Sequence, residues 1–370
     1  MDRAPSVWIV SDRPDLPESH IYAELPRLGV GLTFFHAPDA NPEALARIRE
    51  GGADCVEILI RNRLDFAASA ALRRELRRRP CDVIYATVNK PLAAVLRATI
   101  GFPRVKVVGY RGTIGHLSRF DPASWLTYFH PGLDHVVTVS DAVKRYFTQD
   151  LRFPESKVTR IYKGHDVEWY RSRTTDFEMP ESLRGLTIVS FAGQIRHVKG
   201  VNYLLDAMEL ISENRKIGLL LIGGISEDYL RRRIEKAVHD NPRIVYAGFR
   251  KDVTAIVGKT DIAVMPTVER EGLAKAVIEA QALGVPAIVT DVGGLPEIVR
   301  DGETGLVVPP RDARALADAI LALADDPARR HAMGEAAIRR VTDVFDYRES
   351  ARQFAELFDQ LSLNGVVRHA

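Results

Sequence analysis

Short apolar runs, rich in β-branched residues, recur along the chain with helical stretches between them, and this alternation constrains the fold more than any other feature. The runs are almost continuously apolar, as expected for parallel strands that are covered on both faces. Eleven such runs exceed one comfortable sheet, so the sequence predicts an α/β protein with two doubly wound parallel sheets. They are residues 7–10, 82–86, 105–110, 135–140, 158–162, 186–193, 217–224, 243–248, 261–266, 285–290 and 304–309.

The segment 165–185 is polar, contains proline and is weakly periodic, so we place the domain boundary there. We predict an N-terminal domain over residues 1–166, a linker over 167–185 and a C-terminal domain over 186–346. From Tyr347 onward, YRESARQFAELFDQL has apolar residues at helical spacing and no strand after it. We expect residues 347–370 to form a helix that packs back on the N-terminal domain.

Composition narrows the function classes. The 370 residues suffice for two domains, and the net charge of +2 provides no overall field that would favour nucleic acid as a partner. Cys55 and Cys81 form no zinc-binding or disulfide pattern, which suits a reducing compartment. The first residues lack the apolar core of a signal peptide, and no apolar run is long enough to cross a bilayer. We expect a cytoplasmic protein.

The stretch EGLAKAVIEA places Glu271 and Glu279 at the two ends of an otherwise small or apolar segment. It follows the predicted strand 261–266, and a helix is expected from about Leu273 to Leu283. Ligands bind at the carboxyl ends of parallel strands, beside helix N-termini. A carboxylate there accepts two hydrogen bonds from vicinal hydroxyls, as a ribose or hexose offers. The alternative interpretation is a capping charge plus a solvated glutamate.

Residues 265–310, MPTVEREGLAKAVIEAQALGVPAIVTDVGGLPEIVRDGETGLVVPP, resemble the donor-binding region of the retaining glycosyltransferases of family 4. FAGQIRHVKGVNYLLDAM (191–208) and IYKGHD (161–166) resemble that family's phosphate-gripping loop and hinge. The resemblance covers nearly all of residues 135–345 and is weaker before them. It implies the GT-B fold, in which two Rossmann-like domains face each other across a cleft.

The resemblance also implies an activity. A sugar moves from a nucleoside-diphosphate sugar to a hydroxyl of a glycan or lipid-linked acceptor, with retention of configuration and without a cofactor or metal. The leaving phosphate helps to deprotonate the acceptor, so no side-chain nucleophile is required. The sequence of residues 111–146 resembles that of bacterial envelope polysaccharide enzymes, which suggests lipopolysaccharide, O-antigen or exopolysaccharide synthesis.

The family's donor contacts map onto particular residues. By resemblance, Glu279 holds the donor ribose, and Glu271 contacts the donor sugar near the reacting carbon. Lys199 binds the pyrophosphate, where a cation stabilises the charge on the leaving group. The backbone amides that meet the diphosphate or the sugar hydroxyls are those of Gly272, Leu273 and Ala274, and the base is read around Gly248, Phe249 and Arg250.

The chain departs from the family pattern in two places. Gln194 replaces an arginine of the phosphate loop, so either Arg196 supplies the guanidinium or Lys199 acts alone. Arg111 stands where many members have a histidine; His116 is our candidate for the first-domain contact to the donor sugar, with Arg111 as its rival. For Arg196 and His116 the alternative is a plain surface residue.

The first strand is followed by SDRPDLPESH, where the family often has a glycine pair. Arg13, Glu18 and His20 of this turn are candidates for shaping an acceptor pocket.

Other classes fit less well. VGKTD (257–261) lacks the first glycine of a phosphate-binding P-loop, no GxGxxG follows the first strand, and no Asp-x-Asp is present. Two alternatives to a transferase stay open, namely a nucleotide-sugar epimerase on the same fold and a non-catalytic sugar-nucleotide-binding subunit. The base, the sugar and the acceptor are not specified by the sequence.

The stretch LDFAASAALRRELRRRP (64–80) predicts an amphipathic helix with arginines crowded at its far end. One interpretation is a core-facing stripe, made by Leu64, Ala68, Ala71, Leu72 and Leu76, with a solvated basic face. The other is a patch that makes peripheral contact with the anionic inner face of the cell membrane, where each basic residue contributes about 1 kcal/mol. The arginines concerned are Arg73, Arg74, Arg77, Arg78 and Arg79.

Overall fold

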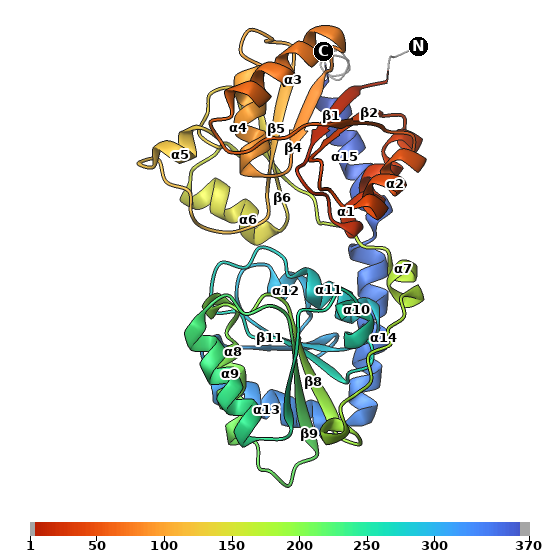
Figure 1. Cartoon of the computed structure of the whole chain (residues 1–370), viewed down its shortest axis with the longest axis vertical. Helices are drawn as coiled ribbons and strands as arrows, with labels where there is room; N and C mark the ends of the chain where they lie inside the picture. The colour runs from red at the N-terminus through yellow and green to blue at the C-terminus, as the bar shows by residue number, and fades with distance from the viewer. Residues whose placement is uncertain (1–3, 363–370) are drawn as a thin grey trace. The chain divides into compact units, whose positions relative to one another are not determined.

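The computed structural model describes residues 4–362, and the chain divides into two compact units (Figure 1). Unit 1 contains the residues up to His165 and those from Phe345 onward, and unit 2 runs from Asp166 to Val344. Each unit is built on one parallel sheet, which confirms the predicted α/β class.

Unit 1 has a sheet in the order β3-β2-β1-β4-β5-β6-β7, with every pairing parallel. Its strands are β1 Ser6–Val10, β2 Gly31–His36, β3 Asp54–Glu57, β4 Val83–Ala86, β5 Lys106–Arg111, β6 His135–Thr138 and β7 Val158–Arg160. Its helices are α1 Leu16–Glu24, α2 Pro42–Glu50, α3 Phe66–Arg78, α4 Asn89–Ala98, α5 Pro122–Trp125, α6 Asp141–Arg145 and α15 Tyr347–Leu361.

Unit 2 has a sheet in the order β10-β9-β8-β11-β12-β13, again parallel throughout. Its strands are β8 Thr187–Ala192, β9 Ile217–Ile222, β10 Ile244–Gly248, β11 Ile262–Met265, β12 Ala287–Thr290 and β13 Gly305–Val308. Its helices are α7 Val167–Ser172, α8 Val201–Leu210, α9 Asp228–Asp240, α10 Val253–Val257, α11 Lys275–Ala282, α12 Leu295–Ile298, α13 Ala313–Ala324 and α14 Pro327–Val344.

All eleven predicted runs coincide with strands, but β2 and β3 were not predicted. The segment of β2, GLTFFH, begins with glycine and takes its apolar character from leucine and two phenylalanines rather than from β-branched residues. The segment of β3, DCVE, lies at the edge of its sheet, and none of its four residues is fully buried. A four-residue edge strand with acidic ends carries too little apolar signal to be recognised.

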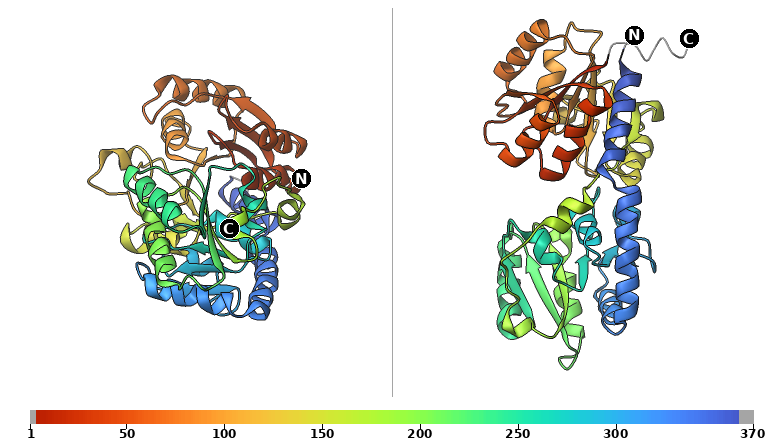
Figure 2. Two further views of the ribbon diagram at one scale, coloured as in Figure 1. Left: turned by 60° about the horizontal axis from the view of Figure 1, so that its bottom comes forward. Right: turned by 90° about the vertical axis from the view of Figure 1, so that its right-hand side faces the viewer.

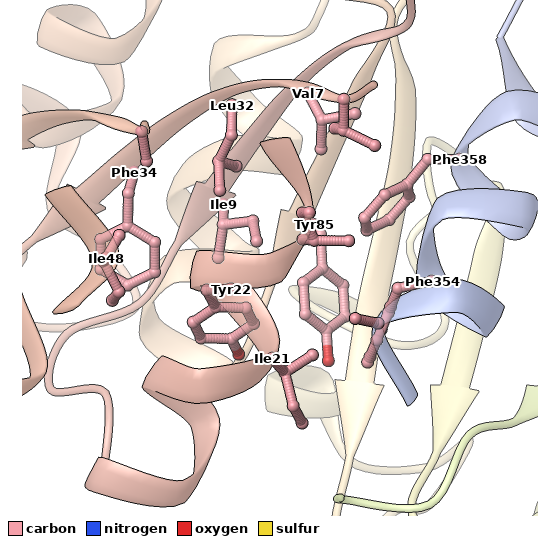
Figure 3. Packing of buried hydrophobic residues seen from close by; sticks show 14 of the residues in the cluster. Val7, Ile9, Ile21, Tyr22, Leu32, Phe34, Ile48, Tyr85, Phe354 and Phe358 are labelled. Atoms are coloured by element: carbon pink, nitrogen blue, oxygen red, sulfur yellow. The ribbon is translucent and has the colours of Figure 1, made fainter. Parts of the chain in front are cut away.

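The C-terminal helix α15 belongs to unit 1, although all of unit 2 separates it from that unit in sequence (Figure 2). It packs against α1, and Phe354 and Phe358 enter a core formed by β1, β2, β4, α1 and α2 (Figure 3). The Tyr85 ring centroid lies 5.1 Å from that of Phe354 and 6.0 Å from that of Phe358. Burial of each aromatic ring stabilises this packing by about 1.5–3 kcal/mol.

Candidate functional site

The carboxyl ends of β8, β9, β10 and β11 carry the loops that form the candidate site in unit 2. These loops approach one another so closely that glycine is required at two positions. A Cβ on Gly223 would lie 1.8 Å from the carbonyl oxygen of Gly193, and one on Gly200 would lie 1.9 Å from that of Pro266. Side chains are therefore excluded from these positions, and the glycines fix how near the loop after β8 comes to the loops after β9 and β11.

Glu271 and Lys199 form an ion pair in this site. The Lys199 Nζ lies 2.5 Å from Glu271 Oε2, and both side chains are mostly buried. The hydroxyl of Thr267, a fully buried residue, donates to the same Oε2 at 3.1 Å. The carbonyl of Thr267 in turn accepts from the Thr290 hydroxyl at 2.5 Å. The Glu271 carboxylate, which the sequence predicts to contact the donor sugar, is thus held by the Lys199 cation and the Thr267 hydroxyl.

The backbone of Glu271 is held by the Gly-Gly turn that follows β12. Gly293 has a φ of +58°, and a Cβ there would lie 1.9 Å from the Glu271 carbonyl oxygen. The amide of Gly294 donates to that oxygen at 3.3 Å. Arg270 has a φ of +60°, which a non-glycine residue adopts only at a cost in energy. The turn therefore fixes the point at which the chain enters the segment before α11.

The segment 272–274 presents amides rather than side chains. Helix α11 starts at Lys275, two residues later than the sequence suggested, and Ala274 caps it without a side-chain hydrogen bond. In residues 4–362 the amides of Gly272, Leu273 and Ala274 donate to no other protein atom, although Gly272 and Ala274 are buried. Buried amides are nearly always paired, so these three are available to a ligand at the positive end of the helix.

Glu279 lies within α11, four residues after the helix begins at Lys275, and only 8% of its surface is exposed. Its Oε2 accepts from the Thr254 hydroxyl at 3.3 Å, its Oε1 lies 3.5 Å from the Tyr170 hydroxyl, and the Lys275 Nζ lies 3.7 Å from Oε1. Tyr170 belongs to α7 and Thr254 to α10. Neither of them was among the predicted site residues, because no local pattern links residues so far apart in the chain.

A pocket of about 320 Å³ lies at the carboxyl ends of β8, β9 and β10. Gln194, Phe249 and Arg250 line it. The side-chain amide of Gln194 donates to the Ser226 hydroxyl at 2.5 Å. The Phe249 ring is 74% exposed, and Gly248 before it has a φ of +71°. The pocket has the location that the resemblance gives to the nucleotide base.

The guanidinium of Arg250 is engaged within unit 2. It donates to Asp252 at 2.9 and 2.8 Å and lies 3.3 Å from Asp176. The hydrogen bond from Arg250, with a second from Thr175, lowers the pKa of Asp252 to about 2. The guanidinium is therefore already occupied, and the predicted contact of Arg250 with the donor would be made by its backbone. Arg196 is exposed, and its side chain makes no hydrogen bond or ion pair within the described residues.

In unit 1 the predicted residues do not form one site. Arg111 is buried, donates to the Thr113 carbonyl at 2.8 Å and to that of Gly115, and lies over the Tyr128 ring. It therefore braces the loop that carries His116, which is exposed and has a φ of +62°. Their predicted contacts to the donor sugar stay predictions.

Two of the three acceptor candidates, Arg13 and His20, lie in different surroundings. Arg13 pairs with Asp39 at the rim of a pocket of about 250 Å³, where Lys90 also pairs with Asp12 at 2.7 Å. His20 is buried, and its ring packs against Tyr347 of α15 at 5.3 Å. The ring of His20 therefore faces α15, and its role in shaping an acceptor pocket stays a prediction.

Glu18, the third residue of that turn, belongs to a buried ion cluster. Lys163 Nζ lies 3.0 Å from Glu18 Oε1 and 2.8 Å from Asp15 Oδ2. Burial lowers the pKa of Lys163, but the charges of Glu18 and Asp15 outweigh it and raise that pKa, so Lys163 stays protonated. This cluster fastens the segment after β7 to the N-terminus of α1.

Two family models match the chain. One, described as Glycosyltransferase Family 4, matches residues 19–169, and the other, described as Glycosyl transferases group 1, matches residues 187–326. The chain belongs to the family 4, or group 1, glycosyltransferases.

Two curated relatives of this glycosyltransferase chain illustrate its range. A D-inositol 3-phosphate glycosyltransferase of Corynebacterium kroppenstedtii is 29% identical over 63% of this chain and 52% of its own length. The capsular polysaccharide biosynthesis glycosyltransferase CapM of Staphylococcus aureus is 27% identical over 57% of each chain. The match thus spans a little over half the length of these relatives.

Solved structures agree over nearly the whole chain. A glycosyltransferase of Rickettsia africae superposes with a TM-score of 0.80 at 18% identity, covering 97% of this chain and 99% of that one. Anabaena HepE in complex with UDP-glucose gives 0.76 at 18% identity, covering 96% and 100%. The fold is GT-B, as the sequence predicted.

No helix in residues 4–362 has the length and apolar character needed to cross a membrane, and no group of three or more His, Cys, Asp or Glu side chains there could hold a metal ion.

Proposed function

We propose that this glycosyltransferase moves a sugar from a nucleoside-diphosphate sugar to a hydroxyl of a glycan or glycolipid acceptor, with retention of configuration. The observation that carries the proposal is the Lys199–Glu271 pair beside three amides at the N-terminus of α11 that are unpaired within residues 4–362. A cation, a carboxylate and a row of free amides suit a diphosphate joined to a polyhydroxylated ring. HepE, of the same fold, holds UDP-glucose.

Lys199 serves the leaving group in this proposal. When the donor binds, its ammonium turns from Glu271 toward the diphosphate and stabilises the negative charge that grows as the sugar–oxygen bond breaks. Arg196, exposed on the same loop, stays our candidate to assist it. The amides of Gly272, Leu273 and Ala274 bind the diphosphate or sugar hydroxyls, and Glu271 orients the sugar. His116 and Arg111 stay our candidates for a contact from unit 1.

The reaction needs no side-chain nucleophile. The bond from the anomeric carbon to the phosphate oxygen breaks, and the acceptor oxygen bonds to that carbon from the same face. The acceptor proton passes to the departing phosphate oxygen. Glu279 holds the ribose hydroxyls. Hydrogen bonds from Thr254 and Tyr170 orient its carboxylate for this contact.

For the pathway, we propose bacterial envelope polysaccharide synthesis, such as lipopolysaccharide, O-antigen or exopolysaccharide, in the cytoplasm at the inner face of the membrane. The relation to a capsular polysaccharide enzyme and the few cysteines support this. A lipid-linked acceptor would bring the enzyme into peripheral contact with an anionic membrane.

The proposal is tested with a panel of UDP-, GDP-, ADP- and dTDP-sugars. A donor should raise the melting temperature, since a ligand stabilises the folded state in proportion to its affinity. That donor should then release nucleoside diphosphate when candidate acceptors are added. Binding without release in the presence of any acceptor would favour the non-catalytic subunit, and conversion to an isomeric nucleotide-sugar would favour the epimerase.

A further inference from the structure

The turn that carries Lys199 is a single 3₁₀ turn, His197–Lys199, between β8 and α8. It closes through two backbone hydrogen bonds, from the Lys199 amide to the Arg196 carbonyl at 2.9 Å and from the Gly200 amide to the His197 carbonyl at 3.0 Å. Arg196 precedes the turn, and within the described chain its side chain does not cap it. The amide of His197, the first of the turn, therefore has no acceptor inside the turn.

The carboxylate of Glu227, from the loop after β9, accepts a hydrogen bond from this amide. The His197 nitrogen lies 3.2 Å from Glu227 Oε1 and 3.1 Å from Oε2. A hydrogen bond to an ionised acceptor is about twice as strong as one between neutral groups. Tyr229 adds a second contact, because its hydroxyl oxygen lies 2.8 Å from His197 Nδ1. The loop after β9 thus contacts both the backbone and the ring of His197.

Glu227 is also the N-cap residue of α9, but its side chain serves the Lys199 turn instead. It makes no capping hydrogen bond to α9, a helix that the structure describes throughout. Short side chains such as Ser, Thr, Asp and Asn are preferred at this position, since they reach the amides of the first turn. The negative charge is still favourable at the positive end of a 13-residue helix. The helix therefore accommodates the charge of Glu227, while the carboxylate is free to bind the His197 amide.

Backbone contacts hold the chain on both sides of this hydrogen bond. The amide of Ile195, a fully buried residue, donates to the Gly224 carbonyl at 2.8 Å. On the other side, the Val268 amide donates to the Val198 carbonyl at 2.9 Å. Helices α8 and α9, which follow the two loops, lie side by side in unit 2 (Figure 1). The Glu227 carboxylate thus acts on the first residue of a turn whose flanking residues are already fixed.

We propose that Glu227 is a positioning residue for the sugar transfer, acting on Lys199 through the amide of His197. The Lys199 ammonium has to meet the diphosphate as its negative charge grows, and a displacement of about 1 Å can slow such a step about a hundredfold. The inference rests on the proposed function for the role of Lys199. The contact between Glu227 and His197 itself requires no donor.

Three variants distinguish this role from a role in α9. Glu227→Asp keeps the charge and gives α9 a better N-cap, but its shorter side chain no longer reaches the His197 amide. It should lower kcat about tenfold, as expected for the loss of one hydrogen bond to a charged group, with a nearly unchanged dissociation constant for the nucleoside diphosphate. Glu227→Gln keeps the length and one acceptor oxygen and should retain most of the activity. Glu235→Asp, at an exposed position of α9, is the matched control and should behave as wild type does.

A double-mutant cycle shows whether Glu227 acts through Lys199. We refer kcat to the concentration of donor-binding sites, measured by calorimetric stoichiometry, so that unfolded protein does not contribute. In the Lys199→Ala background, Glu227→Asp should cause little further loss, because the side chain that it positions is gone. The same fold loss with and without Lys199 would overturn the proposal. Wild-type kcat in Glu227→Asp, or an equal loss in Glu227→Gln, would overturn it as well.

Hydrogen–deuterium exchange separates this inference from the proposed function, since it needs no donor. A peptide spanning residues 194–201 should exchange faster in Glu227→Asp than in wild type or Glu235→Asp, because the His197 amide loses its acceptor. Unchanged exchange would sink the positioning contact alone. Faster exchange in a protein that releases nucleoside diphosphate from none of the donors would count against the proposed function instead.

Discussion

Thr267 offers the sharpest test of how the site holds its carboxylate. Its hydroxyl donates to Glu271 Oε2, the same oxygen that Lys199 contacts. If Lys199 turns to the diphosphate when the donor binds, Thr267 is the group that still orients Glu271. We therefore expect Thr267→Val, a change of nearly constant size, to slow turnover of the donor.

The magnitude follows from the hydrogen bond that is lost. A hydrogen bond to a charged group contributes about 1.5–3 kcal/mol. Because the Gly293–Gly294 turn still holds the backbone of Glu271, part of its orientation survives, and we expect a loss of about 1–2 kcal/mol, which corresponds to about a 5–30-fold fall in kcat/KM. Thr267→Ser retains the hydroxyl and should restore most of the activity.

The assay measures nucleoside diphosphate release with the best donor of the panel. Thr304→Val is the matched control, because this equally buried hydroxyl serves Gln281 and the Arg300 amide, outside the proposed donor contacts. Both variants should lose thermal stability, but only Thr267→Val should lose kcat/KM beyond what the loss of folded protein explains. Wild-type kcat/KM in Thr267→Val, or the same fall in Thr304→Val, would refute the positioning role.

Three further changes test other parts of the site. Glu279→Ala should weaken nucleotide binding by about 1–3 kcal/mol, since it leaves ribose hydroxyls unpaired; an unchanged dissociation constant for UDP or GDP in calorimetry contradicts the assignment. Lys199→Ala should lower kcat more than it raises the KM for the acceptor, and a larger effect of Arg196→Ala would assign the phosphate grip to the arginine. The pKa of Asp252 is depressed from 3.8 to about 2, so its ion pair stabilises the fold above pH 4 and loses that effect as the pH falls toward 2. Asp252→Asn should therefore be less stable than wild type at pH 7 and should lose less stability between pH 4 and 2. Parallel curves of stability against pH for the variant and wild type would contradict this.

Local patterns predicted the parts of the fold whose signal lies within one segment. Runs of β-branched residues marked eleven strands, and helical spacing marked α15 as a helix. Edge strand β3 was missed because its stability comes from pairing with β2 rather than from its own four residues. The α3 helix was predicted, but Leu64 of its supposed core stripe precedes the helix and is exposed.

The site shows the same division between local and long-range information. Glu271, Glu279 and Lys199 were recognisable because each stands in a short motif. Thr254 and Tyr170 were not, because they meet Glu279 only through the packing of α7 and α10 against α11. Arg111 illustrates the converse, since its position in the sequence suggested a ligand contact while the fold gives its guanidinium to two loop carbonyls.

The glycines explain why a motif can specify a site at all. Gly293 allows the chain after β12 to touch the Glu271 carbonyl, and Gly200 allows the loop before α8 to touch that of Pro266. Both contacts involve backbone oxygens, which cannot move aside as a flexible side chain would. The two loops are therefore positioned by steric exclusion on either side of residues 266–271. Thr267, Glu271 and Lys199 meet because of this arrangement, and the unpaired amides of residues 272–274 emerge directly after it.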